Sequence, residues 1–256
     1  MQPKKRFGQN FLTDRKLLED LVTLINVSDK DKFLEIGPGK GDLTENLINL
    51  CGSYFGVEVD KDLLFYLKNK FPENKKAFVN EDIIKLNPSK IYSSNKFRVV
   101  GNIPYNISSP ILDWCEKHYE KIHDMHFMLQ KEFALRCSGN EKTSSYGRLS
   151  VICNYLYKVT ILKEVSKDFF NPIPKVDSLF VRFSPKKKEV NQKELKNLKQ
   201  VTRVLFNKKR KKISNSLEDI LKKENVNKLD LNLNFRPDEL SLNDYLQISA
   251  LVKDDG

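Results

Sequence analysis

The chain has 256 residues, of which 39% are hydrophobic and 31% are charged, and its formal net charge is +11. That length suits one large domain with a small one, and the basic excess favours a polyanionic partner such as nucleic acid. Four cysteines without a C-x-x-C pair argue against a zinc site or a disulfide framework, and no apolar run is long enough for a membrane span. We therefore expect a cytoplasmic protein that binds no metal and no membrane.

The first two-thirds of the chain alternates short apolar runs with amphipathic stretches of helical period. Thr13 is predicted to cap a first helix that ends near Asn26, and further helices are expected over residues 42–50 and 61–70. This alternation predicts βαβ units in an α/β fold with a mainly parallel, doubly wound sheet, whose ligands bind beyond the carboxyl ends of the strands. Seven strands are expected, over residues 33–36, 54–59, 77–79, 97–100, 125–129, 159–165 and 178–183.

The composition changes after Phe183. Residues 184–188 (Ser-Pro-Lys-Lys-Lys) are typical of a linker, and residues 183–256 carry 17 Lys and Arg against 11 Asp and Glu, without a strand pattern. We therefore expect two domains. Residues 1–184 would form the domain around the sheet, and residues 185–256 a small, basic, all-α domain.

A glycine-rich loop follows the first of these strands. Gly37, Gly39 and Gly41 form the pattern G-x-G-x-G, and glycines at such positions let the backbone turn tightly and approach a ligand without an intervening Cβ. By itself the pattern also suits a purely structural turn between a strand and a helix.

Acidic residues at the next two strand ends favour a ligand. Glu58 follows the glycines at the usual offset, about 20 residues, for a side chain that accepts hydrogen bonds from ribose hydroxyls. Asp82 is placed to accept a hydrogen bond from an adenine amine, and residues 7–12 could fold over the site as a lid. No phosphate-binding P-loop pattern is present. A ligand with ribose and adenine but no pyrophosphate fits better than NAD, and S-adenosylmethionine is such a ligand.

The segment from Gly101 to Pro110, after the fourth strand, has the pattern of a catalytic loop. The side-chain oxygen of Asn102 and the carbonyl of Pro104 could bind the two hydrogens of an adenine N6 amine and direct its lone pair at a methyl donor. Tyr105 offers a ring on which the target base can stack. Asn-Ile-Pro-Tyr also occurs by chance in loops, but its place behind a G-x-G-x-G strand loop favours catalysis.

With these motifs the chain resembles the ribosomal RNA adenine N6,N6-dimethyltransferases, and within them the enzymes of the small subunit. The resemblance implies a Rossmann-like class I methyltransferase that dimethylates two adjacent adenosines in the 3′-terminal hairpin loop of small-subunit (16S) rRNA. We expect its partner to be small-subunit rRNA, either as naked RNA or within the immature small ribosomal subunit, and we expect a monomer. The resemblance further implies that Phe170 stacks on the target adenine opposite Tyr105, and that the cofactor contacts are Asn10, Leu12, Gly37, Glu58, Asp82 and Asn102. The matching segments are residues 5–12, 35–39, 101–110, 146–150, 170–178 and 206–211.

Two further features have competing interpretations. The basic run Lys208, Lys209, Arg210, Lys211 and Lys212 is predicted to contact RNA phosphates at a helix start, although a solvated helix surface would look the same. Within it, Lys208 and Lys209 depart from the Arg expected of the family, which puts bidentate phosphate contacts in doubt. Phe170 could equally be a core aromatic; its proline-rich loop favours a functional role.

Two other functions compete with the first. The related large-subunit dimethyltransferases of macrolide resistance share Asn-Ile-Pro-Tyr-Asn-Ile-Ser, but Pro110 and Tyr146-Gly147-Arg148-Leu149-Ser150 are nearer the small-subunit enzymes. A non-enzymatic nucleic-acid-binding protein on the same fold is disfavoured by the intact glycine loop and Asn102. Methyl transfer would distinguish this binding protein from both enzymes.

Overall fold

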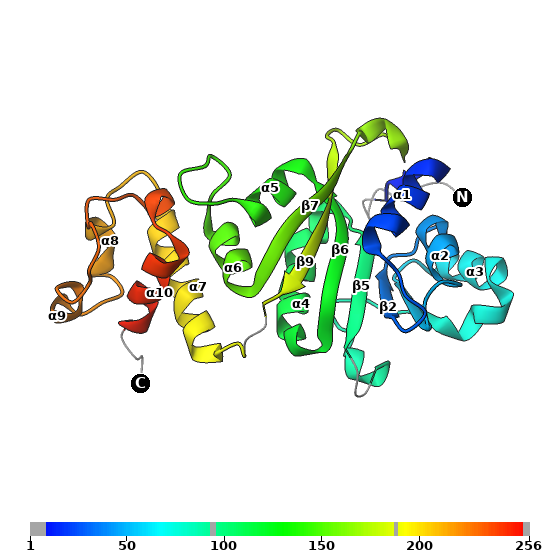
Figure 1. The fold of residues 1–256 in the computed structure, drawn as a ribbon, viewed down its shortest axis with the longest axis horizontal. Coiled ribbons are helices and arrows are strands. Elements are labelled where there is room, and N and C mark those ends of the chain that lie inside the picture. Colours follow the sequence, from blue (N-terminus) through cyan, green and yellow to red (C-terminus); the bar gives the residue numbers. More distant parts are fainter. Residues whose placement is uncertain (1–8, 93–95, 187–188, 253–256) are drawn as a thin grey trace. The chain divides into compact units, whose positions relative to one another are not determined.

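The computed structural model describes residues 9–92, 96–186 and 189–252 (Figure 1). Its centre is a seven-stranded sheet of order β4-β3-β2-β5-β6-β9-β7. The pairs β4–β3, β3–β2, β2–β5 and β5–β6 are parallel, and β6–β9 is antiparallel. The predicted mainly parallel, seven-stranded sheet is therefore confirmed. The strands are β2 (Lys32–Ile36), β3 (Ser53–Glu58), β4 (Phe78–Asn80), β5 (Phe97–Asn102), β6 (Ile122–Gln130), β7 (Tyr157–Val165) and β9 (Ser178–Pro185).

The first helix shows how the local sequence sets an element's start. Its cap is Asp14, whose side chain accepts a hydrogen bond from Leu17 N at 2.7 Å. The prediction of Thr13 as the cap is wrong, because the Thr13 hydroxyl donates instead to the Phe169 carbonyl. The helices along this part of the chain are α1 (Arg15–Ile25), α2 (Asp42–Leu47), α3 (Lys61–Lys70), α4 (Ser108–Lys117), α5 (Lys131–Ser138) and α6 (Arg148–Leu156).

The buried face of α1 joins the core that supports the glycine loop. Leu21 and Ile25 are almost fully buried in the same apolar cluster as Phe33 of β2 and Leu47 of α2. Burying such side chains stabilises the fold by about 1.5–3 kcal/mol each before the loss of entropy. The glycine loop between β2 and α2 is thus held by a rigid base.

A second, two-stranded sheet joins distant parts of the chain. β1 (Phe11–Leu12) pairs antiparallel with β8 (Phe170–Asn171), with Phe11 opposite Asn171 and Leu12 opposite Phe170. The Thr13 amide adds a hydrogen bond to the Phe169 carbonyl at 3.0 Å. This pairing fixes the segment before α1 against the segment before β9.

The chain divides into two compact units, Met1–Ala134 with Thr160–Pro185 and Leu135–Val159 with Lys186–Gly256. In the second unit, an apolar face of α7 packs against α10 and α6. This packing groups residues 135–159 with the C-terminal helices. The predicted division of the chain into two domains at residue 184 stays a proposal. Over its described residues the C-terminal segment is helices and turns, as predicted for an all-α tail; the α-helices are α7 (Gln192–Asn207), α8 (Ser214–Leu217), α9 (Lys223–Val226) and α10 (Leu242–Ala250). No helix among the described residues is long and apolar enough to cross a membrane.

Candidate cofactor and catalytic site

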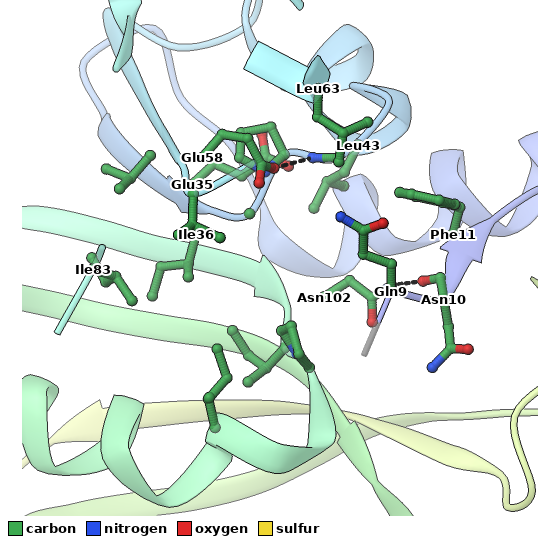
Figure 2. A pocket seen from close by; sticks show the side chains of 18 of the residues that line it. Gln9, Asn10, Phe11, Glu35, Ile36, Leu43, Glu58, Leu63, Ile83 and Asn102 are labelled. Carbon is green, nitrogen blue, oxygen red and sulfur yellow. Dashed lines mark hydrogen bonds between the residues drawn. The ribbon is translucent and has the colours of Figure 1, made fainter. Parts of the chain in front are cut away.

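A cavity of about 260 Å³ lies where β2, β3, β4 and β5 end, with the segment around β1 along it. That volume is near the lower end of the range for small-molecule sites, about 300 Å³. Figure 2 shows Gln9, Asn10 and Phe11 on one side of the pocket and Glu58 and Ile83 on the other. The structure brings together all six residues predicted to contact a cofactor, Asn10, Leu12, Gly37, Glu58, Asp82 and Asn102, and also Pro104 and Tyr105.

The glycine loop needs its glycines for two different reasons. Gly37 and Gly39 both have φ of +63°, a left-handed conformation that costs other residues about 1–2 kcal/mol. A Cβ on Gly37 would meet no atom within 4 Å, so at this point the backbone faces open space in the pocket. A Cβ on Gly39 would lie 3.0 Å from the Phe11 ring, so the second glycine makes room for the β1 segment.

Glu58 is a buried carboxylate with acceptor capacity to spare. One of its oxygens accepts from Gly39 N at 3.1 Å and the other from Asp60 N at 2.9 Å. Burial raises the pKa of Glu58 above its ordinary value. Because a carboxylate has about four acceptor positions, lone pairs remain for the hydroxyls of a ribose in the pocket.

Glu35 is a pocket residue that the sequence analysis missed. Its Oε2 accepts hydrogen bonds from the Thr44 hydroxyl at 2.8 Å and the Tyr54 hydroxyl at 2.6 Å. Burial is the largest cause that raises the Glu35 pKa, to about 7. An acidic residue in an otherwise apolar strand, Phe33-Leu34-Glu35-Ile36, was the signal that could have found it.

The Asn102 side chain is oriented by the N-terminal segment. Its Nδ2 donates to the Asn10 carbonyl at 2.6 Å (Figure 2). Since a carbonyl oxygen only accepts, this bond fixes which end of the amide faces Asn10. The Asn102 Oδ1 is thereby directed elsewhere as an acceptor, at the end of β5 where the pocket opens.

The two residues after Ile103 are held by the turn that follows β5. The Pro104 carbonyl accepts from Ile107 N at 3.1 Å, and the Ser108 hydroxyl lies 3.5 Å from it. One lone pair of the Pro104 carbonyl therefore accepts a hydrogen bond from Ile107 N. The second lone pair has only the long contact with the Ser108 hydroxyl. Tyr105 is half-buried, and its hydroxyl lies 3.0 Å from the Ser178 Oγ.

Phe170 lies elsewhere than its predicted role requires. It is 2% exposed, belongs to the core cluster, and is not among the residues that line the cavity. Its neighbour Phe169 is 38% exposed. In this structure Phe170 is the core aromatic of the competing interpretation, and stacking on a base would require it to leave the core.

The basic run Lys208–Lys212 fills the segment between α7, which ends at Asn207, and α8, which begins at Ser214, so it directly precedes a helix start. Its contact with RNA stays a prediction. Cations after the C-terminal end of α7 also complement the negative end of that helix dipole. Lys208 pairs with Asp219 at 3.0 Å, Lys209 donates to the Tyr146 carbonyl at 3.3 Å, and Lys212 donates to the Asn234 side chain at 2.9 Å. Within the part of the chain that the structure describes, the exposed side chains of Arg210 and Lys211 have no such partner.

Comparison with known proteins shows the family to which the chain belongs. The family described as "Ribosomal RNA adenine dimethylase" matches residues 1–254. The chain belongs to this family. As a ribosomal RNA adenine dimethylase, it is an enzyme whose methyl donor is S-adenosylmethionine. The pocket fits such a ligand, because Glu58 and Asp82 offer acceptors and the backbone at Gly37 is open.

Several relatives of this dimethylase match over its full length. "Ribosomal RNA small subunit methyltransferase A" of Marinobacter nauticus is 39% identical, over 100% of this chain and 93% of the relative. The protein of the same name from Coxiella burnetii is 36% identical, over 98% of both.

Solved structures agree on the fold. A dimethyladenosine transferase from Plasmodium falciparum matches with TM-score 0.76 and 26% identity, over 93% of this chain and 95% of that one. The 23S rRNA methyltransferase ErmE matches with TM-score 0.72 and 25% identity, over 95% and 99%. The dimethylase therefore has the class I methyltransferase fold that its sequence predicted.

Proposed function

We propose that the chain dimethylates N6 of two adjacent adenosines in the 3′-terminal hairpin loop of small-subunit (16S) rRNA, with S-adenosylmethionine as methyl donor. The observation that carries the proposal is the Asn102 amide, oriented by Asn10 at the open end of β5 beside the Glu58 pocket. The choice of the small subunit is supported by the names of the relatives that are 36–39% identical over almost the whole chain.

Different pocket residues bind different parts of the cofactor. Glu58 has acceptor capacity for the ribose hydroxyls, and Asp82 lies at the end of the next strand for the adenine amine. The open backbone at Gly37 lets the ligand approach without a clash. S-adenosylmethionine supplies an electrophilic methyl group when bound.

The catalytic loop acts on the target amine. The N6 lone pair of adenine is delocalised into the ring, so the free amine is a weak nucleophile. Before the first methyl transfer, Asn102 Oδ1 and the Pro104 carbonyl, whose second lone pair has only the long Ser108 contact, accept the two N–H groups of the amine. This favours a tetrahedral nitrogen with a localised lone pair; before the second transfer one N–H remains to be accepted. Preorganised acceptors of this kind, in a site without water, contribute about 10²–10³-fold each to a rate. No strong base is needed, because a proton on the methylated nitrogen is very acidic.

The proposal includes the place of action and the RNA contacts. The enzyme would act in the cytoplasm as a monomer, on an immature small ribosomal subunit. Arg210 and Lys211, which have no side-chain partner among the described residues, are the side chains that we propose contact phosphates.

Transfer of labelled methyl groups from S-adenosylmethionine to under-methylated small and large subunits tests the proposed substrate. We expect label in N6,N6-dimethyladenosine near the 3′ end of the small-subunit RNA. Label on the large subunit would instead support the macrolide-resistance activity. No label on either would support a nucleic-acid-binding role without catalysis.

A paired substitution tests the RNA contacts. Arg210→Gln with Lys211→Gln should weaken RNA binding and reduce the slope of log K against log salt by about 1.4–1.8, since each phosphate contact contributes about 0.7–0.9. Lys75→Gln with Lys76→Gln removes the same charge from two exposed lysines elsewhere and serves as the control. Equal slopes for the two double variants would contradict the assignment.

A further inference from the structure

The ring of Tyr105 is fixed at both ends. Its backbone begins the single turn Tyr105–Ile107 after Pro104, and its hydroxyl lies 3.0 Å from the Oγ of Ser178 on β9. We infer that Ser178 is a positioning residue, whose hydroxyl holds the Tyr105 ring in the orientation that receives the target adenine. This inference rests on the proposed function, because it needs the base to stack on Tyr105.

Ser178 is a rigid anchor for such a bond. It is fully buried and is the first residue of β9, in register with Gln130 of β6. The residue before it is also held, because the Asp177 carbonyl accepts from Lys131 N at 3.0 Å and its carboxylate from Lys167 N at 3.0 Å. The backbone that carries the serine hydroxyl is therefore held in place on both sides.

The loop end of Tyr105 is restrained as well. The Ile107 amide closes the turn onto the Pro104 carbonyl at 3.1 Å, and the buried Ser108 hydroxyl lies 3.4 Å from the Tyr105 carbonyl. With its backbone held in the turn and its hydroxyl held on β9, the Tyr105 side chain has little freedom to swing away from its position. Tyr105 and Asn102 line the same cavity.

A restrained ring lowers the cost of binding the base. A tyrosine at the edge of an open pocket loses side-chain entropy when a base stacks on it, and such ordering weakens binding by about 2- to 12-fold per side chain. The Ser178 hydroxyl moves this loss from RNA binding to folding. Its removal should therefore affect the RNA step and leave the cofactor pocket unchanged.

Three variants test the tether: Ser178→Ala, Tyr105→Phe and the two combined. We expect each single variant to lower kcat/KM for under-methylated small subunits about 3- to 10-fold, mainly through KM, with unchanged S-adenosylmethionine affinity. The combined variant should lose no more than either single variant, because both remove the same bond. Ser166→Ala, in the segment before β8, removes a hydroxyl whose side-chain contact is with Asp168, and should behave as wild type.

Multiplicative effects of the two changes, or a Ser178→Ala enzyme with wild-type kcat/KM, would overturn the tether. If Ser178→Ala fails to fold, Tyr105→Phe still decides, since it removes only a hydroxyl; wild-type kinetics in that variant would also overturn the inference. Absence of transfer by the wild-type enzyme itself would overturn the proposed function, which separates the two failures.

Discussion

Two polar clusters lie at opposite ends of the same strand, β5, and they differ in how their polar groups are used. Arg98 is near the amino end of β5 and Asn102 is at its carboxyl end. Around Arg98 the polar groups bond to one another, whereas around Asn102 several acceptors keep capacity for a ligand. The comparison separates what holds the sheet together from what the sheet holds for chemistry.

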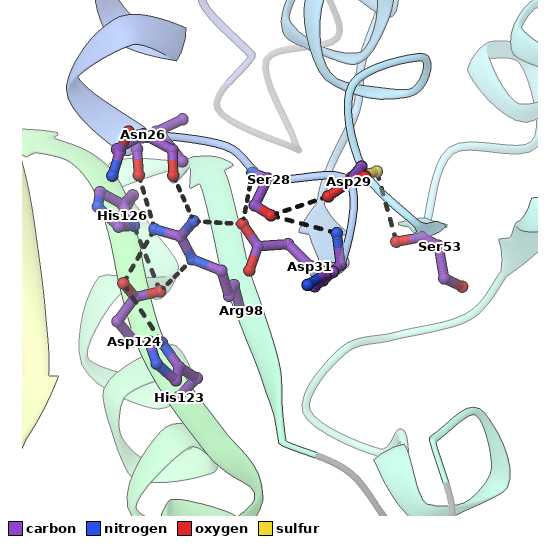
Figure 3. Close-up of polar contacts among 12 residues, drawn as sticks. Asn26, Ser28, Asp29, Asp31, Ser53, Arg98, His123, Asp124 and His126 are labelled. Carbon is purple, nitrogen blue, oxygen red and sulfur yellow. Dashed lines mark hydrogen bonds and ion pairs between the residues drawn. The ribbon is translucent and has the colours of Figure 1, made fainter.

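The Arg98 cluster uses all five guanidinium donors of a side chain that is almost fully buried (Figure 3). Two go to Asp124 at 2.8 and 3.0 Å, and one to Asp31 at 2.8 Å. The others reach the carbonyls of Ile25 and Asn26 at 2.7 and 3.0 Å, where α1 ends. This cluster therefore ties α1 to β5, β6 and the start of β2.

The pocket around Asn102, at the carboxyl ends of β2, β3 and β5, shows the opposite use of polar groups. Glu35 and Glu58 are buried acids whose pKa values are raised by burial, and neither has an arginine or lysine partner among the described ion pairs. Both acids accept hydrogen bonds, but a buried acid without a cation still destabilises a fold. Their presence at the pocket therefore fits a functional role better than a structural one. The difference teaches that stability and function are assigned to different ends of one strand.

Breaking the paired end should have the largest effect on stability. Arg98→Met leaves Asp124 and Asp31 as buried or half-buried acids without their cation, and we expect a loss of about 3–5 kcal/mol in the free energy of unfolding. Denaturant unfolding measures it. Arg15→Met, which removes an exposed arginine paired with Glu19, should cost less than about 0.5 kcal/mol. Equal losses would contradict the contrast.

Neutralising the buried acid Glu35 in the pocket should raise the free energy of unfolding instead of lowering it. The Glu35 pKa is about 7 in the folded protein against an ordinary 4.5. Its contribution to stability is therefore complete below pH 4.5 and is lost as the pH rises to 7. Glu35→Gln removes that loss, so the stability of the variant relative to wild type should rise by about 3 kcal/mol between pH 4.5 and 8, at about 1.4 kcal/mol per pKa unit.

Unfolding curves at the two pH values test this prediction. Glu45→Gln is the control, because Glu45 is exposed and its pKa is lowered by a hydrogen bond to Lys70. The Glu45 variant should show no such rise. Parallel pH dependence of the Glu35 variant and wild type would show that Glu35 is ionised at little cost.

Filling the open backbone should have the smallest effect on stability and a clear one on the cofactor. Gly37→Ala adds a Cβ that points into open space in the pocket, at a φ of +63°, so stability should fall by only about 1–2 kcal/mol. S-adenosylmethionine affinity, measured by calorimetry, should fall about tenfold, in line with ~1.4 kcal/mol. Gly147→Ala, also without neighbours but at negative φ, should leave that affinity unchanged.

Most strands of the sheet and many pocket residues could be predicted from the sequence, because both depend on local patterns. Apolar runs marked the strands, and strand ends marked Gly37, Glu58, Asp82 and Asn102. The β1–β8 pairing could not be predicted, since it joins two-residue strands about 160 positions apart with no periodicity to announce it.

The errors have the same physical origin. Phe170 is buried because it pairs with Leu12, a long-range contact that no proline-rich loop pattern reveals. Asp14 caps α1 in place of Thr13, because the Thr13 hydroxyl donates a hydrogen bond to the Phe169 carbonyl.

The most direct test of the central claim is methyl transfer by Asn102→Ala in a single turnover on under-methylated small subunits. Thermal unfolding on the same sample shows that the fold persists, and saturating S-adenosylmethionine compensates for the loss of the predicted Asn102 cofactor contact. The account predicts a folded variant whose transfer rate falls at least about 100-fold, because the acceptor for the N6 hydrogens is gone. Transfer at the wild-type rate would contradict the claim that the oriented Asn102 amide activates the target amine.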